Sequence, residues 1–293
     1  MRLSRRTALR GAAASAATAL SGWLPALPAI AAGVPGVTDA EIVLGGVFAL
    51  TGPVRLITEP YEQGARAYFD RVNKAGGVHG RRIRWLVEDD AYTPAKALAG
   101  AKKLVDRDGV AFLFGQLGTQ TTLAIAPYAE QAKVPFFSAS PAPAQQRTYT
   151  FGLMADYTDE MYEIVRHLVS KGGKARIGYL FQNDDLGEVG RRGIDKALAE
   201  AGLKLAAAVG FERGTSDYGT QILAMRDANP DAVIVMATAP AIAAAIKQAG
   251  GMGFAPLWAT YGVGSSNIMQ QLLGPSIEGL LYATELQDQY SDT

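Results

Sequence analysis

Residues 110–137 read VAFLFGQLGTQTTLAIAPYAEQAKVPFF, and they carry the clearest indication of the fold class. A short apolar run at residues 110–114 leads through Gly115 and a threonine-rich turn into a helical run at 121–131. A second short apolar run follows at residues 134–137. Short apolar runs on either side of a helix-length segment predict two strands joined by a helix. A helical crossover of this kind connects parallel strands, so the stretch predicts an α/β sheet.

The same alternation extends in both directions along the chain. Before the central stretch we expect strands at 42–50 and 83–87 and helices at 59–74 and 93–106. Residues 141–148, PAPAQQRT, interrupt the rhythm and read as a linker. After it we expect helices at 159–171, 187–201, 218–227, 241–249 and 268–273, and strands at 175–181, 204–211, 232–237, 257–259 and 279–283.

Two alternating series joined by a linker predict an α/β fold with two doubly wound parallel-sheet lobes and a hinge between them. The expected division is a leader at 1–32, an N-terminal lobe at 33–144, a C-terminal lobe at 145–283 and the start of a return crossing at 284–293. In open parallel sheets the ligand lies at the carboxyl ends of the strands, so we expect a binding cleft between the lobes.

The N-terminus has the pattern of an export signal. Residues 4–10, SRRTALR, precede an apolar run at 11–27, and Ala29-Ile30-Ala31 forms a small-x-small cleavage site. Adjacent arginines at positions 5 and 6 favour the twin-arginine route, and an ordinary secretory leader is the alternative. Either route predicts a periplasmic protein.

Composition excludes several classes of protein. The chain has 28 basic and 28 acidic residues, and four of the basic ones lie in the leader, so the mature chain is mildly acidic. Nothing in this balance favours nucleic acid or an anionic membrane as a partner. Cysteine is absent, which excludes a disulfide, a catalytic thiol and a lipidated cysteine as membrane anchor.

Catalytic motifs are also missing. The sequence contains no G-x-S-x-G, H-E-x-x-H, Walker or G-x-G-x-x-G motif, so we expect a protein that is not an enzyme and that uses no cofactor. Asp89 and Asp90 at a strand end are expected to cap the next helix or bond the hinge. His79 and His167 lie too far apart in the sequence to suggest a ligand pair, so no metal site is expected.

Several local patterns together resemble a known family. They are ALTGP at 49–53, NKAGGVHGR at 73–81, EDD at 88–90 followed by Pro94, DGV at 108–110, DY at 217–218 and PDAV at 230–233. Over roughly residues 41–290 the chain resembles the periplasmic leucine/isoleucine/valine-binding proteins, the type I solute-binding family of branched-chain amino acid ABC transporters. The resemblance implies a monomeric, extracytoplasmic protein that binds a small carboxylate-bearing solute, such as an amino acid or an aromatic or aliphatic acid. A membrane permease would then be its partner.

One departure from the family concerns the C-terminus. In the family the chain crosses between the lobes three times, whereas this sequence ends near the expected second crossing. The resemblance therefore implies a truncated chain whose first lobe is incomplete and exposes a strand edge and apolar surface. A sensory protein that docks on a membrane receptor and a non-functional fragment remain alternatives to a transport component.

Candidate ligand contacts in the first lobe lie at two strand ends. The turn containing Gln116, Gly118 and Thr119 opens a helix, where backbone N–H groups favour an anion, although a plain helix cap would look the same. The resemblance places the family's carboxylate-binding serine at Thr119. It also places backbone and hydroxyl contacts at Ser140 and Ala142, the latter without a hydroxyl. Ser138 and Ser140 are candidates too, with turn residues that bond their own backbone as the alternative.

In the second lobe the resemblance supplies five positions. Asp156 and Tyr157 correspond to the acidic region near a ligand amine, with a helix-starting acid as the alternative. Leu186 stands where an aromatic side chain often closes over the ligand, and Thr238 where the family has a tyrosine. Tyr261 stands where amino-acid binders have a glutamate for the ligand ammonium, and a phenol lacks that charge. The ligand class therefore stays open between a branched-chain amino acid, a carboxylate without an α-amine, an aromatic acid and an amide.

Overall fold

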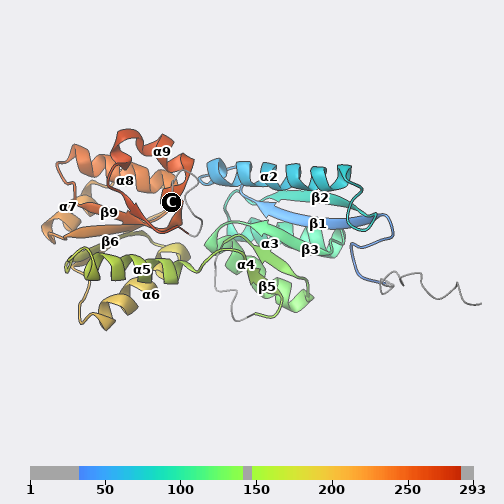
Figure 1. Cartoon of the computed structure of the whole chain (residues 1–293), viewed down its shortest axis with the longest axis horizontal. Helices are drawn as coiled ribbons and strands as arrows, with labels where there is room; N and C mark the ends of the chain where they lie inside the picture. The colour runs from blue at the N-terminus through green and yellow to red at the C-terminus, as the bar shows by residue number, and fades with distance from the viewer. Residues whose placement is uncertain (1–32, 141–146, 285–293) are drawn as a thin grey trace, which may run out of the picture. The chain divides into compact units, whose positions relative to one another are not determined.

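The computed structural model describes residues 33–140 and 147–284, in which strands alternate with helices (Figure 1). Both predicted parallel sheets are present, and both belong to one compact unit that begins at Pro35. Within the described ranges, no helix has both the length and the apolarity needed to cross a bilayer. The predicted α/β fold with two parallel sheets is confirmed.

The first sheet has the strand order β2-β1-β3-β4-β5, and every neighbouring pair is parallel. Its strands are β1 (Glu41–Phe48), β2 (Arg82–Asp89), β3 (Phe112–Gln116), β4 (Phe136–Ser138) and β5 (Thr150–Gly152). Its helices are α2 (Arg55–Lys74), α3 (Pro94–Lys102), which continues into one π-helical turn, η1 (Lys103–Arg107), and α4 (Thr119–Ala132).

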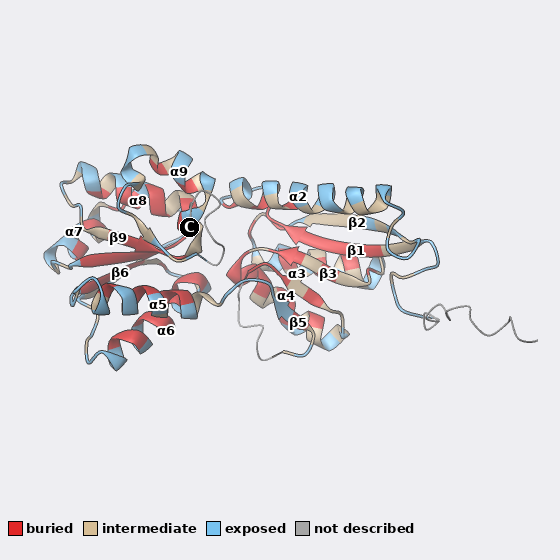
Figure 2. Cartoon of the chain, viewed as in Figure 1, coloured by how far each residue is buried: buried red, intermediate tan, exposed pale blue. Residues whose placement is uncertain are grey.

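Helices cover both faces of this sheet. Leu113 of β3 is buried in a core with Leu104 and with Ile125 of α4. The next strand residue, Phe114, points to the opposite face and packs edge-on against Phe69 of α2 at a centroid distance of 5.8 Å. Figure 2 shows the other side of α2 as an exposed surface. The sheet is therefore doubly wound, as expected.

Strand β5 extends the first lobe beyond the predicted boundary at residue 144. Residues Thr150, Phe151 and Gly152 pair in parallel with β4, so this part of the chain completes the edge of the first sheet. The sequence did not predict a strand here because three residues carry too little pattern. Phe151 stacks on Phe137 at 5.0 Å and remains 44% exposed.

The second sheet has the order β10-β9-β8-β6-β7, again parallel throughout. Its strands are β6 (Ile177–Gln182), β7 (Ala207–Phe211), β8 (Ala232–Met236), β9 (Leu257–Thr260) and β10 (Leu281–Tyr282). Its helices are α5 (Tyr157–Ser170), α6 (Asp185–Glu200), α7 (Gly219–Asp227), α8 (Ala239–Gly251) and α9 (Asn267–Leu273), with short 3₁₀ turns at η2 (Gly262–Ser265) and η3 (Gly274–Ile277). All five residues of the central strand β8 are buried.

Each strand order reverses once, between β1 and β3 in the first sheet and between β6 and β8 in the second. A parallel sheet opens a crevice at such a switch point, at the carboxyl ends of the strands. The loops that follow β1, β3, β6 and β8 are therefore the places to look for a binding site.

Several helices begin two residues before the predicted start. Helix α6 begins at Asp185 rather than 187 because the Asp184 carboxylate accepts a hydrogen bond from the Leu186 N–H and caps the helix. The first turn of a helix carries little apolar periodicity, so capping rather than pattern sets its start.

Candidate functional site

A cavity of about 210 Å³ lies where loops from both sheets meet. The lining residues lie in loops that follow strands or in the first turns of the helices after them, as expected for a site at the carboxyl ends of the strands. Its volume is below the roughly 300–1,000 Å³ of pockets that hold drug-sized ligands, so a small solute would fill it. The lining residues are Val54, Ile57, Tyr92, Leu117, Gly118, Thr119, Met154, Tyr157, Leu186, Thr238, Ala239, Tyr261, Gly262, Val263 and Ser266.

Helix α4 begins at this cavity. Gly118 is its N-cap with φ of +128°, a conformation that favours glycine, and a Cβ there would lie 2.6 Å from Thr121 Oγ1. Thr119, the first helical residue, is only 2% exposed, and its hydroxyl has no hydrogen-bond partner among the described residues. A buried hydroxyl at a helix N-terminus, beside a cavity, can donate to an anionic ligand.

Gln116 supports this turn from behind and does not line the cavity. Its side-chain amide donates to Asp90 Oδ2 at 3.1 Å, to Thr121 Oγ1 at 2.8 Å and to the Leu117 carbonyl. It thereby ties the end of β3 to the first turn of α4. The structure gives Gln116 a positioning role for Leu117 and Gly118, which are lining residues.

Ser138 and Ser140 lie deeper than the cavity wall. The Ser138 hydroxyl contacts Thr122 Oγ1 at 2.9 Å, the Gln116 carbonyl at 3.1 Å and the backbone of Ser140. These contacts favour the alternative in which Ser138 satisfies its own turn. Ser140 is 1% exposed, and its hydroxyl has no partner within residues 33–140 and 147–284. Ala142 lies outside the described residues.

In the second lobe, four of the predicted residues line the cavity. Leu186 is in the first turn of α6, and Thr238 is the N-cap residue of α8 without a side-chain capping bond. Tyr157 and Tyr261 pack edge to face at a centroid distance of 4.8 Å. The Tyr261 hydroxyl donates to the Ala237 carbonyl at 3.0 Å. Burial raises the pKa of Tyr261 well above its ordinary value, so this phenol stays neutral.

Asp156 does not line the cavity. Its carboxylate accepts from the Thr158 N–H at 2.8 Å and caps α5, which is the structural alternative stated for it. Glu160, one turn further along, accepts from the Gly262 N–H at 2.7 Å and is 6% exposed. Sequence reasoning missed Glu160 because its partner lies about a hundred residues away, with nothing local to mark it.

Arg213, also missed, links the two lobes beside the cavity. Its guanidinium donates to the Tyr92 carbonyl at 3.2 Å and to Gln120 Oε1 of the first lobe, and to Asp184 Oδ2 of its own lobe at 2.8 Å. It also lies over the Tyr92 ring at 5.1 Å. Burial, together with the nearby Asp184 carboxylate, raises the pKa of Tyr92, so this lining phenol is neutral too.

The remaining missed lining residues are mostly apolar. Val54 and Ile57 follow β1, and Tyr92 follows β2, so their position after a strand end was the available signal. Their side-chain types gave none, since Val, Ile and Tyr fill cores far more often than ligand sites.

The acidic pair at the end of β2 is held by protein groups. Asp89 accepts from the backbone N–H groups of Leu50, Thr51 and Ala91 and from the Thr51 hydroxyl. Asp90 accepts from the Tyr92 N–H at 2.7 Å and from Gln116. Both carboxylates therefore bond the loop that carries Tyr92, and neither caps the next helix, α3, whose N-cap residue is Thr93.

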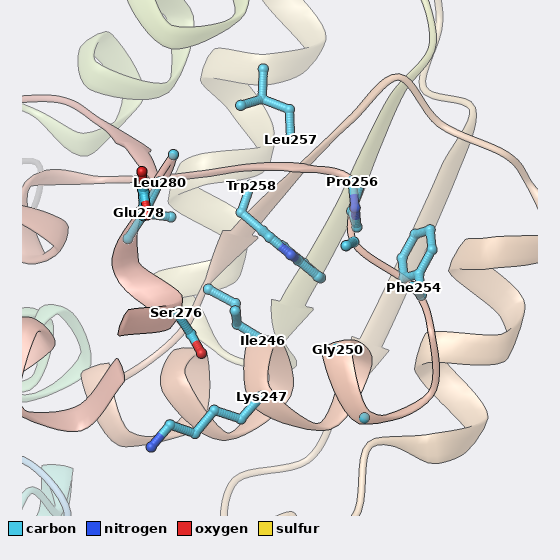
Figure 3. Close-up of a pocket in the computed structure, with 13 residues that line it drawn as sticks. Ile246, Lys247, Gly250, Phe254, Pro256, Leu257, Trp258, Ser276, Glu278 and Leu280 are labelled. Atoms are coloured by element: carbon cyan, nitrogen blue, oxygen red, sulfur yellow. The ribbon is translucent and has the colours of Figure 1, made fainter. Parts of the chain in front are cut away.

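A second pocket, of about 580 Å³, is larger but lies at the other end of the second sheet (Figure 3). It is lined by the C-terminal end of α8, the start of β9 and η3, including Ile246, Lys247, Trp258 and Glu278. In parallel sheets, ligands bind at the carboxyl ends of the strands, whereas Leu257 here begins its strand. We therefore take the smaller cavity as the candidate site.

Comparison with known proteins agrees with the fold and with the resemblance noted above. A family model described as periplasmic binding protein matches residues 41–293. A leucine-, isoleucine-, valine-, threonine- and alanine-binding protein from Pseudomonas aeruginosa is 28% identical over 246 residues, which cover 82% of this chain. They cover 65% of that relative, so the chain spans less than two thirds of its length.

Two solved structures illustrate the likeness. A possible leucine/isoleucine/valine-binding protein from Rhodopirellula baltica superposes with a TM-score of 0.77 at 26% identity, over 86% of this chain and 70% of that one. A fatty acid ABC transporter substrate-binding protein from Thermomonospora curvata superposes with a TM-score of 0.75 at 23% identity, over 85% of this chain and 64% of that one. The second likeness concerns the fold alone.

Proposed function

We propose that this chain, which belongs to the periplasmic binding protein family, binds a small carboxylate-bearing solute in the 210 Å³ cavity and delivers it to the membrane permease of an ABC uptake system. The family consists of extracytoplasmic solute-binding proteins, so the chain is not an enzyme. We propose export of a monomer by the twin-arginine route; the residues of the leader lie outside the described ranges.

The observation that carries the carboxylate proposal is the Thr119 hydroxyl. It is buried at the first turn of α4, faces no partner among the described residues and belongs to the cavity lining. The N–H groups of a helix's first turn lack intrahelical partners, and the helix dipole favours negative charge there. A carboxylate placed at this point would satisfy both the hydroxyl and the backbone donors.

The lobes would supply different parts of the binding energy. The first lobe offers the polar contacts at α4, while Leu186, Tyr157 and Tyr261 of the second lobe offer apolar surface for the rest of the solute. We propose that the solute contacts the first lobe while the lobes stand apart, and that a hinge rotation then closes the second lobe over it. The closed form is the one that the permease would recognise.

A thermal-shift screen of the purified chain tests the proposal. The panel contains aliphatic and aromatic carboxylates, amino acids and the matching neutral amides. A ligand at a hundred times its Kd raises the free energy of unfolding by about 2.7 kcal/mol, which raises Tm by several degrees. We expect shifts with carboxylates and none with amides, and small-angle X-ray scattering should show a smaller radius of gyration with the bound acid. A shift with amides alone would refute a carboxylate-binding function, and so would the absence of a shift with every compound of the panel.

Transport is tested separately. Deleting the gene should abolish uptake of the labelled acid identified by the screen, and a plasmid copy should restore it. Unchanged uptake in the deletion strain would contradict the transport role while leaving the binding site in place.

A further inference from the structure

Among residues 33–140 and 147–284, no charged side chain lines the candidate cavity. All the lining residues identified above are apolar, aromatic, glycine or hydroxyl-bearing. An amino acid brings two charges into such a site, a carboxylate and an α-ammonium, and each needs a partner when it leaves water. The distribution of donors and acceptors around the cavity shows which of the two charges it can accept.

Two helix N-termini face the cavity and favour a negative charge. Gly118, the N-cap of α4, and Thr238, the N-cap of α8, are both lining residues. These helices are 14 and 13 residues long, so each presents the positive end of a full helix dipole. Independently of the dipoles, the unpartnered Thr119 hydroxyl, 2% exposed, is a donor at the same end of α4.

The carboxylates nearest the cavity are already engaged. Asp184 accepts from the Leu186 N–H, the Gln182 amide and Arg213. Asp90 is held by the Tyr92 N–H and by Gln116. The Glu160 carboxylate accepts a hydrogen bond from the N–H of Gly262, a lining residue. None of the three lines the cavity, so an α-ammonium would find no carboxylate partner in the part of the lining that the structure describes.

Tyr261 lines the cavity on the side of the second lobe. Its hydroxyl hydrogen is donated to the Ala237 carbonyl, and its ring packs against Tyr157. The phenol is neutral because it is buried. Tyr261 therefore offers an apolar ring to the ligand and no negative charge.

We propose that the cavity selects aliphatic or aromatic carboxylic acids that lack an α-ammonium group over the corresponding amino acids, with Tyr261 as the specificity-determining residue. The inference rests on the proposed function, because it concerns the same cavity. The carboxylate binds at Thr119 and the first turn of α4, and the apolar body lies against Leu186, Tyr157 and Tyr261. An ammonium on the α-carbon would be buried between two positive helix ends without a counter-charge.

Two ligand pairs that differ only at the α-carbon test this inference. They are 4-methylpentanoate with L-leucine, and 3-phenylpropanoate with L-phenylalanine, each titrated into the purified chain by isothermal titration calorimetry. We expect the acid of at least one pair to bind at least tenfold more tightly than its amino acid. The cost of burying an unpaired ammonium corresponds to roughly this change in Kd or more. Amino acids that bind as tightly as their acids would overturn the inference and leave the proposed function standing. If neither member of either pair binds, the inference fails too, and the thermal-shift screen then shows whether the proposed function fails with it.

Variants at Tyr261 assign the selectivity to this residue. Tyr261→Phe keeps the ring and should keep the preference for the acid, whereas Tyr261→Glu introduces a carboxylate and should narrow or reverse the preference. An unchanged preference in a folded Tyr261→Glu protein would overturn the role of Tyr261. Circular dichroism shows whether this variant folds.

Variants at Thr119 test the same inference without placing a charge in the core. Thr119→Val removes the hydroxyl at almost constant volume and should weaken binding of the acid roughly tenfold, while Thr119→Ser should retain it. Equal affinities of Thr119→Val and the wild type would show that the carboxylate lies elsewhere and would overturn the binding mode.

Discussion

Replacing Arg213 with methionine should weaken ligand binding, because Arg213 joins the two lobes at the edge of the cavity. Its guanidinium donates to the Tyr92 carbonyl and to Gln120 of the first lobe and lies over the Tyr92 ring. Methionine keeps an unbranched apolar side chain, shorter than that of arginine, and loses all of these contacts. Asp184 would keep its bonds to Leu186 and Gln182, so no carboxylate is left without partners.

The magnitude follows from the contacts that cross between the lobes. A hydrogen bond with a charged donor contributes about 1.5–3 kcal/mol when buried. Because the Arg213 side chain is 35% exposed, we assign about 1 kcal/mol to each of its two hydrogen bonds with the first lobe. The cation–π contact adds about 0.5 kcal/mol. The bond to Asp184 lies within one lobe and does not count. The sum of about 2–2.5 kcal/mol corresponds to a Kd roughly 30- to 70-fold higher.

Isothermal titration calorimetry with the acid that gives the largest thermal shift measures this change. Arg191→Met is the matched control, because Arg191 is 37% exposed and pairs with Asp195 at 2.8 Å, as Arg213 pairs with Asp184, but within a single helix. We expect the control to leave Kd unchanged. Equal Kd values for the two variants would refute the idea that Arg213 holds the lobes together around the ligand.

Three further predictions concern Gly118, Gly193 and the carboxylate of Asp89. Gly118→Ala should lower ligand affinity at least tenfold, since its Cβ would meet Thr121 and Tyr92 at 2.6 Å. The control is Gly80→Ala, which is also at positive φ but has nothing within 4 Å of its Cβ. It should leave affinity unchanged in the same titration. Gly193→Ala should lower the free energy of unfolding by about 1–3 kcal/mol, because its Cβ would lie 2.0 Å from the Thr158 carbonyl oxygen between α6 and α5. Gly64→Ala, whose Cβ would lie in open space on α2, should raise the free energy of unfolding by up to about 1 kcal/mol. Urea denaturation curves that shift in the same direction for Gly193→Ala and Gly64→Ala would contradict these two expectations. Partial burial acts to raise the pKa of Asp89, but the hydrogen-bond donors of Thr51, Ala91 and Leu50 outweigh it and lower the pKa below 3.8. This carboxylate therefore stabilises the fold above pH 3.8. Its contribution is lost as the pH falls through the pKa of the folded state. Asp89→Asn should therefore be less stable than the wild type at pH 7 by a margin that shrinks near pH 3, and a margin that is the same at both values would argue against it.

Local sequence patterns were sufficient for the architecture. The apolar run of β3, the helical period of α4 and the apolar run of β4 lie within one stretch of about thirty residues, and both periods depend only on near neighbours. The sequence did not predict the three-residue strand β5, because pairing with β4, and not its own pattern, makes it a strand. Thr119 and Tyr261 were placed near the site by the family resemblance, and both line the cavity.

The site itself needed the tertiary structure. Asp156 and Tyr157 are adjacent in the sequence, yet only Tyr157 lines the cavity, because the Asp156 carboxylate turns to cap α5. Arg213 meets Tyr92 across 121 residues, and Glu160 meets Gly262 across 102, so no local signal could have paired them. Apart from β5, the strands and helices followed from the sequence pattern, since backbone periodicity is a local property. The direction of each side chain was decided only when loops from distant parts of the chain packed against one another. The uncharged lining formed by the described residues is a result of that packing.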